Sequence, residues 1–164
     1  DTLSQQGKVE EQKDGMDMAL AMIDMEEKNL EFGGAYNPLY LIREPTGSDD
    51  AIVEYFALEE DGHRLYDLKG DRQPVGIYAM ESDFSTKKVQ LLDGDKIYLF
   101  SDGFADQIGG PRSKKFMSRN FKKTLLRIHH LPMKEQKKHL NDILETWRGD
   151  NEQGDDILVM GMRI

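Results

Sequence analysis

The sequence has no cysteine. This absence excludes disulfide bonds, thiol catalysis and any zinc or iron–sulfur site that cysteine would ligate. No uninterrupted apolar run in the sequence approaches the length of roughly 20 residues that a membrane-spanning helix needs. Its N-terminal stretch, DTLSQQGKVEEQKDG, contains no apolar segment behind a basic one, so we expect no secretory leader. Together these absences predict a cytoplasmic protein that makes no membrane contact through this segment.

Basic residues are the minority among the charged ones. The 22 Lys and Arg stand against 31 Asp and Glu, and the formal net charge is −9. A chain of this charge is a poor candidate for nonspecific nucleic-acid binding, so we expect no nucleic-acid partner. Ten of the basic residues nevertheless lie between Arg112 and Lys138, beside a single acid, Glu135. We interpret this stretch as the solvated side of two helices; a docking face for an acidic or phosphorylated partner is the alternative.

The length and the apolar pattern predict one α+β domain over residues 1–164. Seven Phe, six Tyr and nine Met are too many apolar groups for a disordered tail, although residues 1–13 are polar and resemble one. Alternating apolar residues predict a buried strand over 16–23, followed by strands over 30–35 and 39–43 in an antiparallel meander. Residues 51–60 favour a strand or a short helix, and Asp61-Gly62 predicts a hairpin turn at the edge of the sheet.

The second half of the sequence changes its period. Strands are predicted over 84–91, 96–101 and 157–164, the last of them buried. Apolar residues at helical spacing predict a helix over 113–130, and a second helix from about Pro132 to a stop at Gly149. This order of elements predicts an antiparallel sheet with helices packed on one face.

Two acidic segments could carry chemistry, because each lies where a strong strand begins or ends. Asp102-Gly103 follows the apolar strand IYLFS, where a carboxylate projects from a rigid edge and glycine permits close approach of a ligand. Asp155-Asp156 precedes the final apolar strand, and adjacent carboxylates need a compensating metal ion or basic side chain. Such oxygens suit magnesium or manganese if the two segments meet. Both segments are also compatible with solvated turns, which is the usual role of an adjacent acidic pair, and that alternative stays open on these residues alone.

Five blocks of sequence, in order, resemble the stage II sporulation protein E-like (SpoIIE-like) serine phosphatases, which are bacterial relatives of the metal-dependent 2C-type (PP2C) protein phosphatases. The blocks are DGMDMALAMID, LEFGGAYNPLYLIR, DRQPVGIY, LLDGDKIYLFSDGFADQIGG and GDDILVMGMRI. The resemblance runs from about Asp14 to Ile164. It implies an α-β-β-α sandwich, in which two antiparallel sheets lie between helical layers.

The resemblance also implies a reaction. Members of the family hydrolyse phosphoserine or phosphothreonine with water held between two manganese or magnesium ions, and they need no protein nucleophile. By motif, Asp102 and Asp155 would be metal ligands, Asp156 would support the ligand loop, and Gly103 would shape the turn at Asp102. The implied substrate is a phosphorylated regulatory protein, such as an anti-anti-sigma (STAS) domain. Sensor domains outside the present chain are common in the family.

The sequence departs from the family pattern in two places. The Asp-x-x-Gly-His-Gly segment that carries the bridging metal ligand is absent, together with the acid on the strand before it, and Gly154 stands where an apolar residue is common. We therefore expect an N-terminally incomplete domain that is inactive, or nearly so, by itself. One alternative is a degenerate phosphatase fold that only binds a partner. Another is a structural or sensory domain in which both acidic motifs are turns.

Overall fold

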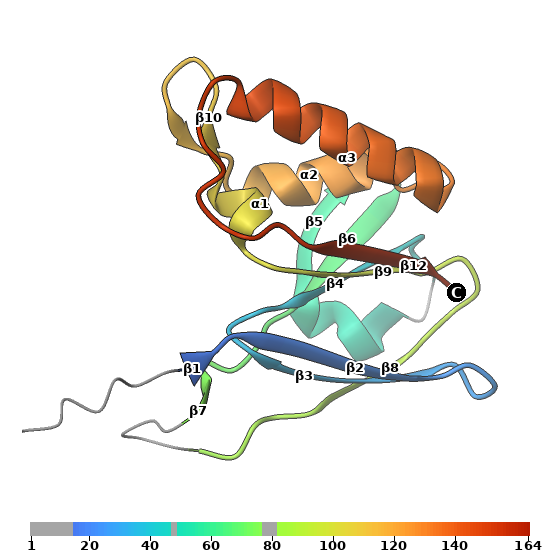
Figure 1. The fold of residues 1–164 in the computed structure, drawn as a ribbon. Helices are drawn as coiled ribbons and strands as arrows, with labels where there is room; N and C mark the ends of the chain where they lie inside the picture. Colours follow the sequence, from blue (N-terminus) through green and yellow to red (C-terminus); the bar gives the residue numbers. More distant parts are fainter. Residues whose placement is uncertain (1–14, 47–48, 77–81) are drawn as a thin grey trace, which may run out of the picture.

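A computed structural model describes residues 15–46, 49–76 and 82–164 of the chain. Two antiparallel sheets pack face to face, and the three described α-helices cover the outer face of the larger sheet (Figure 1). Strand β4 (Leu39–Arg43) lies at the centre of this layering, because all of its residues are buried. Leu39 and Leu41 belong to the cluster between the sheets, whereas Tyr40 and Ile42 belong to the cluster beneath the helices.

The larger described sheet contains five antiparallel strands in the order β12-β9-β4-β6-β5. Besides β4, its members are β5 (Phe56–Glu60), β6 (His63–Leu68), β9 (Lys96–Phe100) and β12 (Val159–Arg163). A 3-10 helix, Asp49–Tyr55, leads into β5, so residues 51–60 contain both of the predicted alternatives. The hairpin turn at Asp61-Gly62 and the edge position of β5 are confirmed.

The smaller described sheet has the order β2-β3-β8, with β2 (Met18–Asp24), β3 (Asn29–Ala35) and β8 (Lys87–Gln90). Two short ladders pair β1 (Gly15–Met16) with β7 (Val75–Gly76), and β10 (Ile108–Gly109) with β11 (Lys114–Lys115). The helices are α1 (Gly103–Asp106), α2 (Ser118–Ile128) and α3 (Met133–Arg148). Gly149 ends α3 as predicted, with a φ of 55°. The polar residues 1–13 lie outside the described part of the chain.

Aromatic side chains fill the layer between the larger sheet and the helices. The ring centroids of Tyr40 in β4 and Phe100 in β9 are 4.4 Å apart. Phe121 of α2 lies 5.0 Å from Phe100 and 4.8 Å from Phe104 of α1. Because Phe104 is buried in this cluster, it anchors α1 immediately after Asp102.

The structure corrects the predicted meander and the start of the first long helix. Strand β3 pairs with β2 and β8, whereas β4 belongs to the other sheet. Tyr36, with a φ of 57°, lies in the three-residue connection through which the chain crosses between the sheets. The helix predicted over 113–130 begins only at Ser118, because the β10–β11 hairpin occupies the residues before it.

The predicted burial of the strands near each end of the chain is wrong. Met16, Leu20 and Met22 are 56%, 61% and 64% exposed, and Met160 of β12 is 57% exposed. Strands β2 and β12 each lie at the edge of a sheet. In addition, no described helix covers the outer face of the smaller sheet (Figure 1). Apolar composition on both sides of a strand is therefore not sufficient evidence for burial on both sides.

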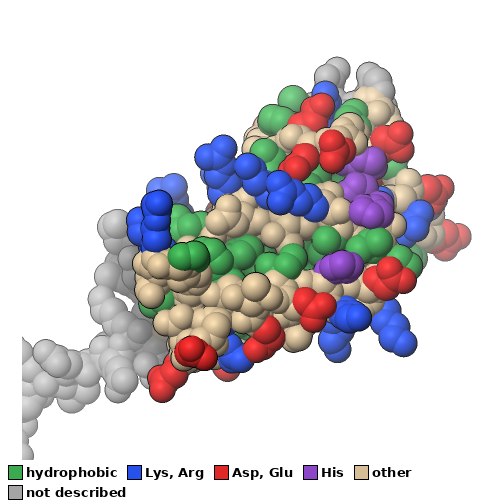
Figure 2. Space-filling model, turned by 90° about the horizontal axis from the view of Figure 1, so that it is seen from above, with side chains coloured by type: hydrophobic (Ala, Val, Ile, Leu, Met, Phe, Trp, Pro, Cys, Tyr) green, Lys and Arg blue, Asp and Glu red, His purple; other side chains and the backbone are tan. Residues whose placement is uncertain are grey.

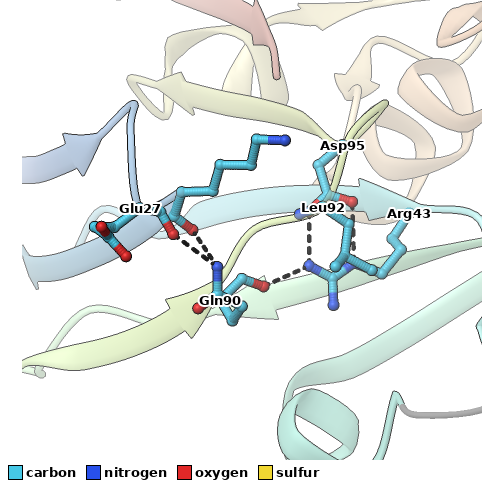
Figure 3. A network of polar contacts seen from close by, with 6 residues as sticks. Glu27, Arg43, Gln90, Leu92 and Asp95 are labelled. Carbon is cyan, nitrogen blue, oxygen red and sulfur yellow. Dashed lines mark hydrogen bonds and ion pairs between the residues drawn. The ribbon is translucent and has the colours of Figure 1, made fainter.

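A buried ion pair links β4 to the residue just before β9, and its arginine also reaches the smaller sheet (Figure 3). Arg43 Nε and Nη2 donate to Asp95 Oδ1 at 3.0 Å and Oδ2 at 2.6 Å. Arg43 Nη2 also donates to the backbone carbonyl of Gln90 in β8, at 2.9 Å. Asp95 Oδ2 further accepts the N–H of Leu92 at 2.9 Å. The side chains of Arg43 and Asp95 are 6% and 1% exposed, so the pair is shielded from water.

The helical face carries much of the basic stretch 112–138. Eight of the ten Lys and Arg side chains of this stretch are exposed. Figure 2 looks onto this side of the molecule and shows Lys and Arg side chains spread over it. Two of them, Lys115 and Arg127, form ion pairs with Asp106 and Glu60. For the residues of α2 and α3 these positions agree with the interpretation as solvated helix surface, whereas Arg112, Lys114 and Lys115 lie in the β10–β11 hairpin, before α2 begins. Within the described residues, no helix has the length and apolar character to cross a membrane.

Candidate functional site

Strands β9 and β12 bring the two acidic segments together. The strands are antiparallel, with Phe100 opposite Val159, so the end of β9 lies beside the start of β12. Ser101 then joins the two segments. Its hydroxyl donates to the carbonyl of Asp156 at 2.7 Å and accepts the N–H of Leu158 at 2.9 Å. The segments that carry Asp102 and Asp155 therefore meet at one end of the larger sheet, as the sequence-based hypothesis requires.

Gly103 packs directly on the backbone of the second acidic segment. A Cβ atom at this position would lie 2.4 Å from the carbonyl oxygen of Asp156, which is closer than such atoms can approach. Any larger residue would push the two segments apart. Asp102 is the N-cap residue of α1, yet its carboxylate makes no capping hydrogen bond. The carboxylate of Asp102 is thus available to a ligand.

A cleft of about 450 Å³ lies beside Asp102. Both signs of charge line it. The acidic side chains are Asp17, Asp67, Asp102 and Asp106, and the basic ones are Lys69, Arg72 and Lys122. Tyr36, Tyr40 and Phe100 contribute aromatic surface. A cleft with separate carboxylate and cationic groups can hold a metal ion, a phosphate group or both.

Asp17, between β1 and β2, is a candidate site residue that the sequence did not single out. Partial burial and the negative charge of Asp102 raise the pKa of Asp17 above its usual range. The two carboxylates come from segments far apart in the chain and line the same cleft. A pair of carboxylates that repel each other favours a bound cation. The available signal was one acid inside the apolar alternation of residues 16–23.

The described residues supply only part of a metal site. Asp17 and Asp102 line the cleft, whereas Asp155 is not among its lining residues, and Asp155 Oδ1 accepts the N–H of Asp156 at 2.7 Å. Among the described residues, no three His, Asp or Glu side chains form a group that could hold a metal ion. Carboxylate oxygens are the right kind of ligand for manganese or magnesium. The present set is nevertheless incomplete, so the metal roles of Asp102 and Asp155, and the supporting roles of Gly103 and Asp156, stay predictions.

The comparison of the chain with known families decides its membership. The sequence profile of stage II sporulation protein E (SpoIIE) matches residues 3–164. The chain belongs to this family. The resemblance identified from the five sequence blocks is thereby confirmed. No curated protein matches the chain in sequence.

Solved structures confirm the fold class. The PP2C domain of SiaA from Pseudomonas aeruginosa is 30% identical and superposes with a TM-score of 0.71, over 90% of this chain and 51% of that one. A manganese-presoaked phosphatase domain of the cell fate determinant SpoIIE from Bacillus subtilis gives a TM-score of 0.54 at 16% identity, over 90% of this chain and 56% of that one. The second likeness shows the fold alone. This SpoIIE-family chain therefore has the α+β fold with antiparallel sheets of the PP2C-type phosphatases, and it spans about half the length of these two chains.

Proposed function

We propose that the chain forms part of a metal-dependent protein serine/threonine phosphatase domain. The observation that supports this most directly is the contact between the two acidic segments, made through Ser101 and Gly103, in a member of the SpoIIE family. In the whole domain, manganese or magnesium would supply an activated water for attack on the phosphoester. Asp102 and Asp155 would bind metal, Asp17 would add a carboxylate to the cleft, and Asp156 would support the ligand loop.

The proposed substrate is phosphoserine or phosphothreonine on a regulatory partner protein of the anti-anti-sigma (STAS) type. The family resemblance is the basis for this choice. The net charge of −9 favours a protein partner over nucleic acid. We propose a cytoplasmic location, with any sensor domain lying outside the present segment.

We further propose that the isolated chain is inactive or nearly so, since its described residues provide an incomplete ligand set. Two measurements test this: manganese binding by calorimetry and phosphate release from a phosphoserine peptide. Both are made on this chain and on the natural full-length protein. We expect manganese-dependent turnover in the full-length protein and close to none in the chain. Rapid turnover by the chain would contradict the incomplete ligand set.

The role of Asp102 is tested in the full-length protein. Asp102→Asn should abolish turnover and weaken manganese binding, because it removes a charged oxygen ligand while nearly preserving shape. The matched control is Asp93→Asn, since Asp93 is 84% exposed and its only described ion pair is with Lys28. Unchanged metal affinity in Asp102→Asn would contradict its metal role and support the alternative in which the acidic motifs are structural turns.

A partner-binding module without catalysis is the second candidate function. It is favoured by the absence of a three-ligand metal group among the described residues. In that case the full-length protein would bind its partner but would neither bind manganese tightly nor release phosphate. The same two measurements therefore separate the two candidates.

A further inference from the structure

The cleft beside Asp102 contains two cationic side chains that have no acidic partner in the described part of the chain. Lys69 and Arg72 belong to the loop between β6 and β7, and both are exposed. Within the described residues neither side chain forms an ion pair, although Asp17, Asp102 and Asp106 line the same cleft. Lys122, the third basic residue, differs from them because it donates to Asp67 Oδ2 at 2.6 Å.

Backbone hydrogen bonds fix the loop that carries these two residues. The N–H of Asp71 donates to the carbonyl of Gly34 at 2.8 Å, and the N–H of Tyr36 donates to the carbonyl of Asp71 at 2.9 Å. The carboxylate of Asp71 accepts the N–H of Ser85 at 2.7 Å and its hydroxyl at 2.9 Å. Lys69 and Arg72 therefore extend from a backbone held on both sides, so a ligand would not have to order the loop.

Close packing at Gly70 holds the same loop against β3. A Cβ atom at Gly70 would lie 2.9 Å from the carbonyl oxygen of Asn37 and 3.0 Å from the carbonyl carbon of Gly34. Only glycine permits this approach, and the approach fixes the position of the backbone from which the Lys69 side chain extends.

The third basic side chain of the cleft, Lys122, already has a counter-ion in Asp67. The side chains of Lys122 and Asp67 are 18% and 10% exposed, and the Lys122 ammonium lies 5.1 Å from the centre of the Tyr40 ring. That pair is nearly neutral as a unit. As far as residues 15–46, 49–76 and 82–164 show, Lys69 and Arg72 thus provide two unpaired positive charges on a cleft that the Asp17 and Asp102 carboxylates also line.

We propose that Lys69 and Arg72 form a phosphoryl-recognition wall of the cleft, where the guanidinium and ammonium groups bind the phosphate oxygens of a phosphoserine segment. The proposal rests on the proposed phosphatase function and names the residues that recognise its substrate. A guanidinium can donate two parallel hydrogen bonds to a phosphate, and an ammonium adds a point charge. The Asp17 and Asp102 carboxylates, which by themselves would repel a phosphate, line the same cleft and are the groups proposed above to bind the cation.

The test measures binding without metal or turnover. A phosphoserine peptide is titrated into the uniformly ¹⁵N-labelled chain, and amide shifts are followed at cleft residues such as Gly70 and Ala105. The same peptide without phosphate is the ligand control. Lys69→Gln/Arg72→Gln is compared with Lys88→Gln. Lys88 is the control because its ammonium group pairs with Glu31 on the smaller sheet. Thermal unfolding shows whether each variant is folded, and exposed side chains such as these should change it little.

We expect saturable shifts at the cleft for the phosphorylated peptide only. The double variant should weaken that binding by at least about tenfold, since each charge-assisted contact is typically worth this much. Lys88→Gln should bind like the unchanged chain. Equal binding of both peptides, shifts confined to another surface, no detectable binding, or an unaffected double variant would each overturn the proposal.

The outcome is separable from that of the phosphatase proposal. Loss of peptide binding in the double variant supports the recognition wall even if the isolated chain releases no phosphate. Conversely, manganese-dependent turnover with full affinity for substrate in Lys69→Gln/Arg72→Gln full-length protein would overturn the wall and leave the phosphatase function standing.

Discussion

Replacing Asp95 by alanine should destabilise the chain far more than any exposed substitution in the same turn. Asp95 is the partner of the Arg43 guanidinium, and both side chains are almost fully buried. In Asp95→Ala, Arg43 keeps only its hydrogen bond to the carbonyl of Gln90. The N–H of Leu92 also loses its acceptor. The variant therefore leaves a buried cation without its counter-ion and a partly buried donor without its acceptor.

The expected cost follows from these two losses. Removing one partner of a buried ion pair typically costs about 3–5 kcal/mol, because the remaining charge is neither solvated nor compensated. Single domains are stable by only about 5–15 kcal/mol, so the change removes a large fraction of the total. With a urea dependence of roughly 1–3 kcal/mol per molar, the unfolding midpoint should fall by about 2 M.

Urea unfolding followed by circular dichroism measures this effect. Asp93→Ala is the matched control. Asp93 lies two residues away, and its side chain, which forms an ion pair with Lys28, is 84% exposed. An exposed pair of this kind contributes about 0–1 kcal/mol. The double variant Arg43→Met/Asp95→Leu removes both charges and should recover much of the loss.

Equal destabilisation by Asp95→Ala and Asp93→Ala would refute the reasoning. So would a double variant that is no more stable than Asp95→Ala, since it would mean that the uncompensated charge is not the source of the cost. A changed urea dependence would indicate a loosened native state rather than a lost ion pair.

Three further predictions concern single sites. Asp102→Asn should lower the pKa of Asp17 toward its ordinary value, measured by carboxyl NMR titration, because the variant removes the negative charge beside it; an unchanged pKa would show that the two carboxylates do not interact. Gly103→Ala should destabilise the chain in urea by more than about 2 kcal/mol through its clash with the Asp156 carbonyl, while Gly154→Ala, with no atom within 4 Å of its Cβ position, should be near neutral. Burial and the neighbouring charge of His63 lower the pKa of His129 to about 4. Between pH 6.5 and pH 4 the unfolded imidazole therefore binds more protons than the folded one. The free energy of unfolding should fall by about 1–3 kcal/mol as the pH is lowered through this range. His129→Phe should lose that part of the pH dependence, and an identical pH profile would contradict it.

The local sequence pattern was sufficient to predict most of the strands and to suggest that the two acidic segments meet. The segments that form β9 and β12 are strongly apolar, and the sequence shows an acid shortly after the first, Asp102, and shortly before the second, Asp155. Their antiparallel pairing makes the two ends adjacent without any contribution from the loops.

Features that depend on a third segment were not predictable in this way. A three-residue connection such as 36–38 fits a hairpin or a crossing between sheets equally well, and only packing on both faces of β4 selects the crossing. The burial of Asp95 depends on Arg43, which lies 52 positions away in the sequence. Asp17 is a site residue because folding places it in the same cleft as Asp102, and the local pattern around Asp17 does not predict that proximity.

The close contact between Gly103 and Asp156 has a consequence for the lengths of the segments around it. The spacing of the two acids is set by the β9–β12 ladder, whose residues each advance the chain by about 3.3 Å. Inserting one residue between Asp156 and Val159 would shift Asp155 by that step or turn every side chain of β12 to its opposite face. Residues 149–154 are all exposed and precede the contact, so additions there can bulge into solvent. Tolerance to insertion should therefore change abruptly across Asp155, high on its N-terminal side and low on its C-terminal side.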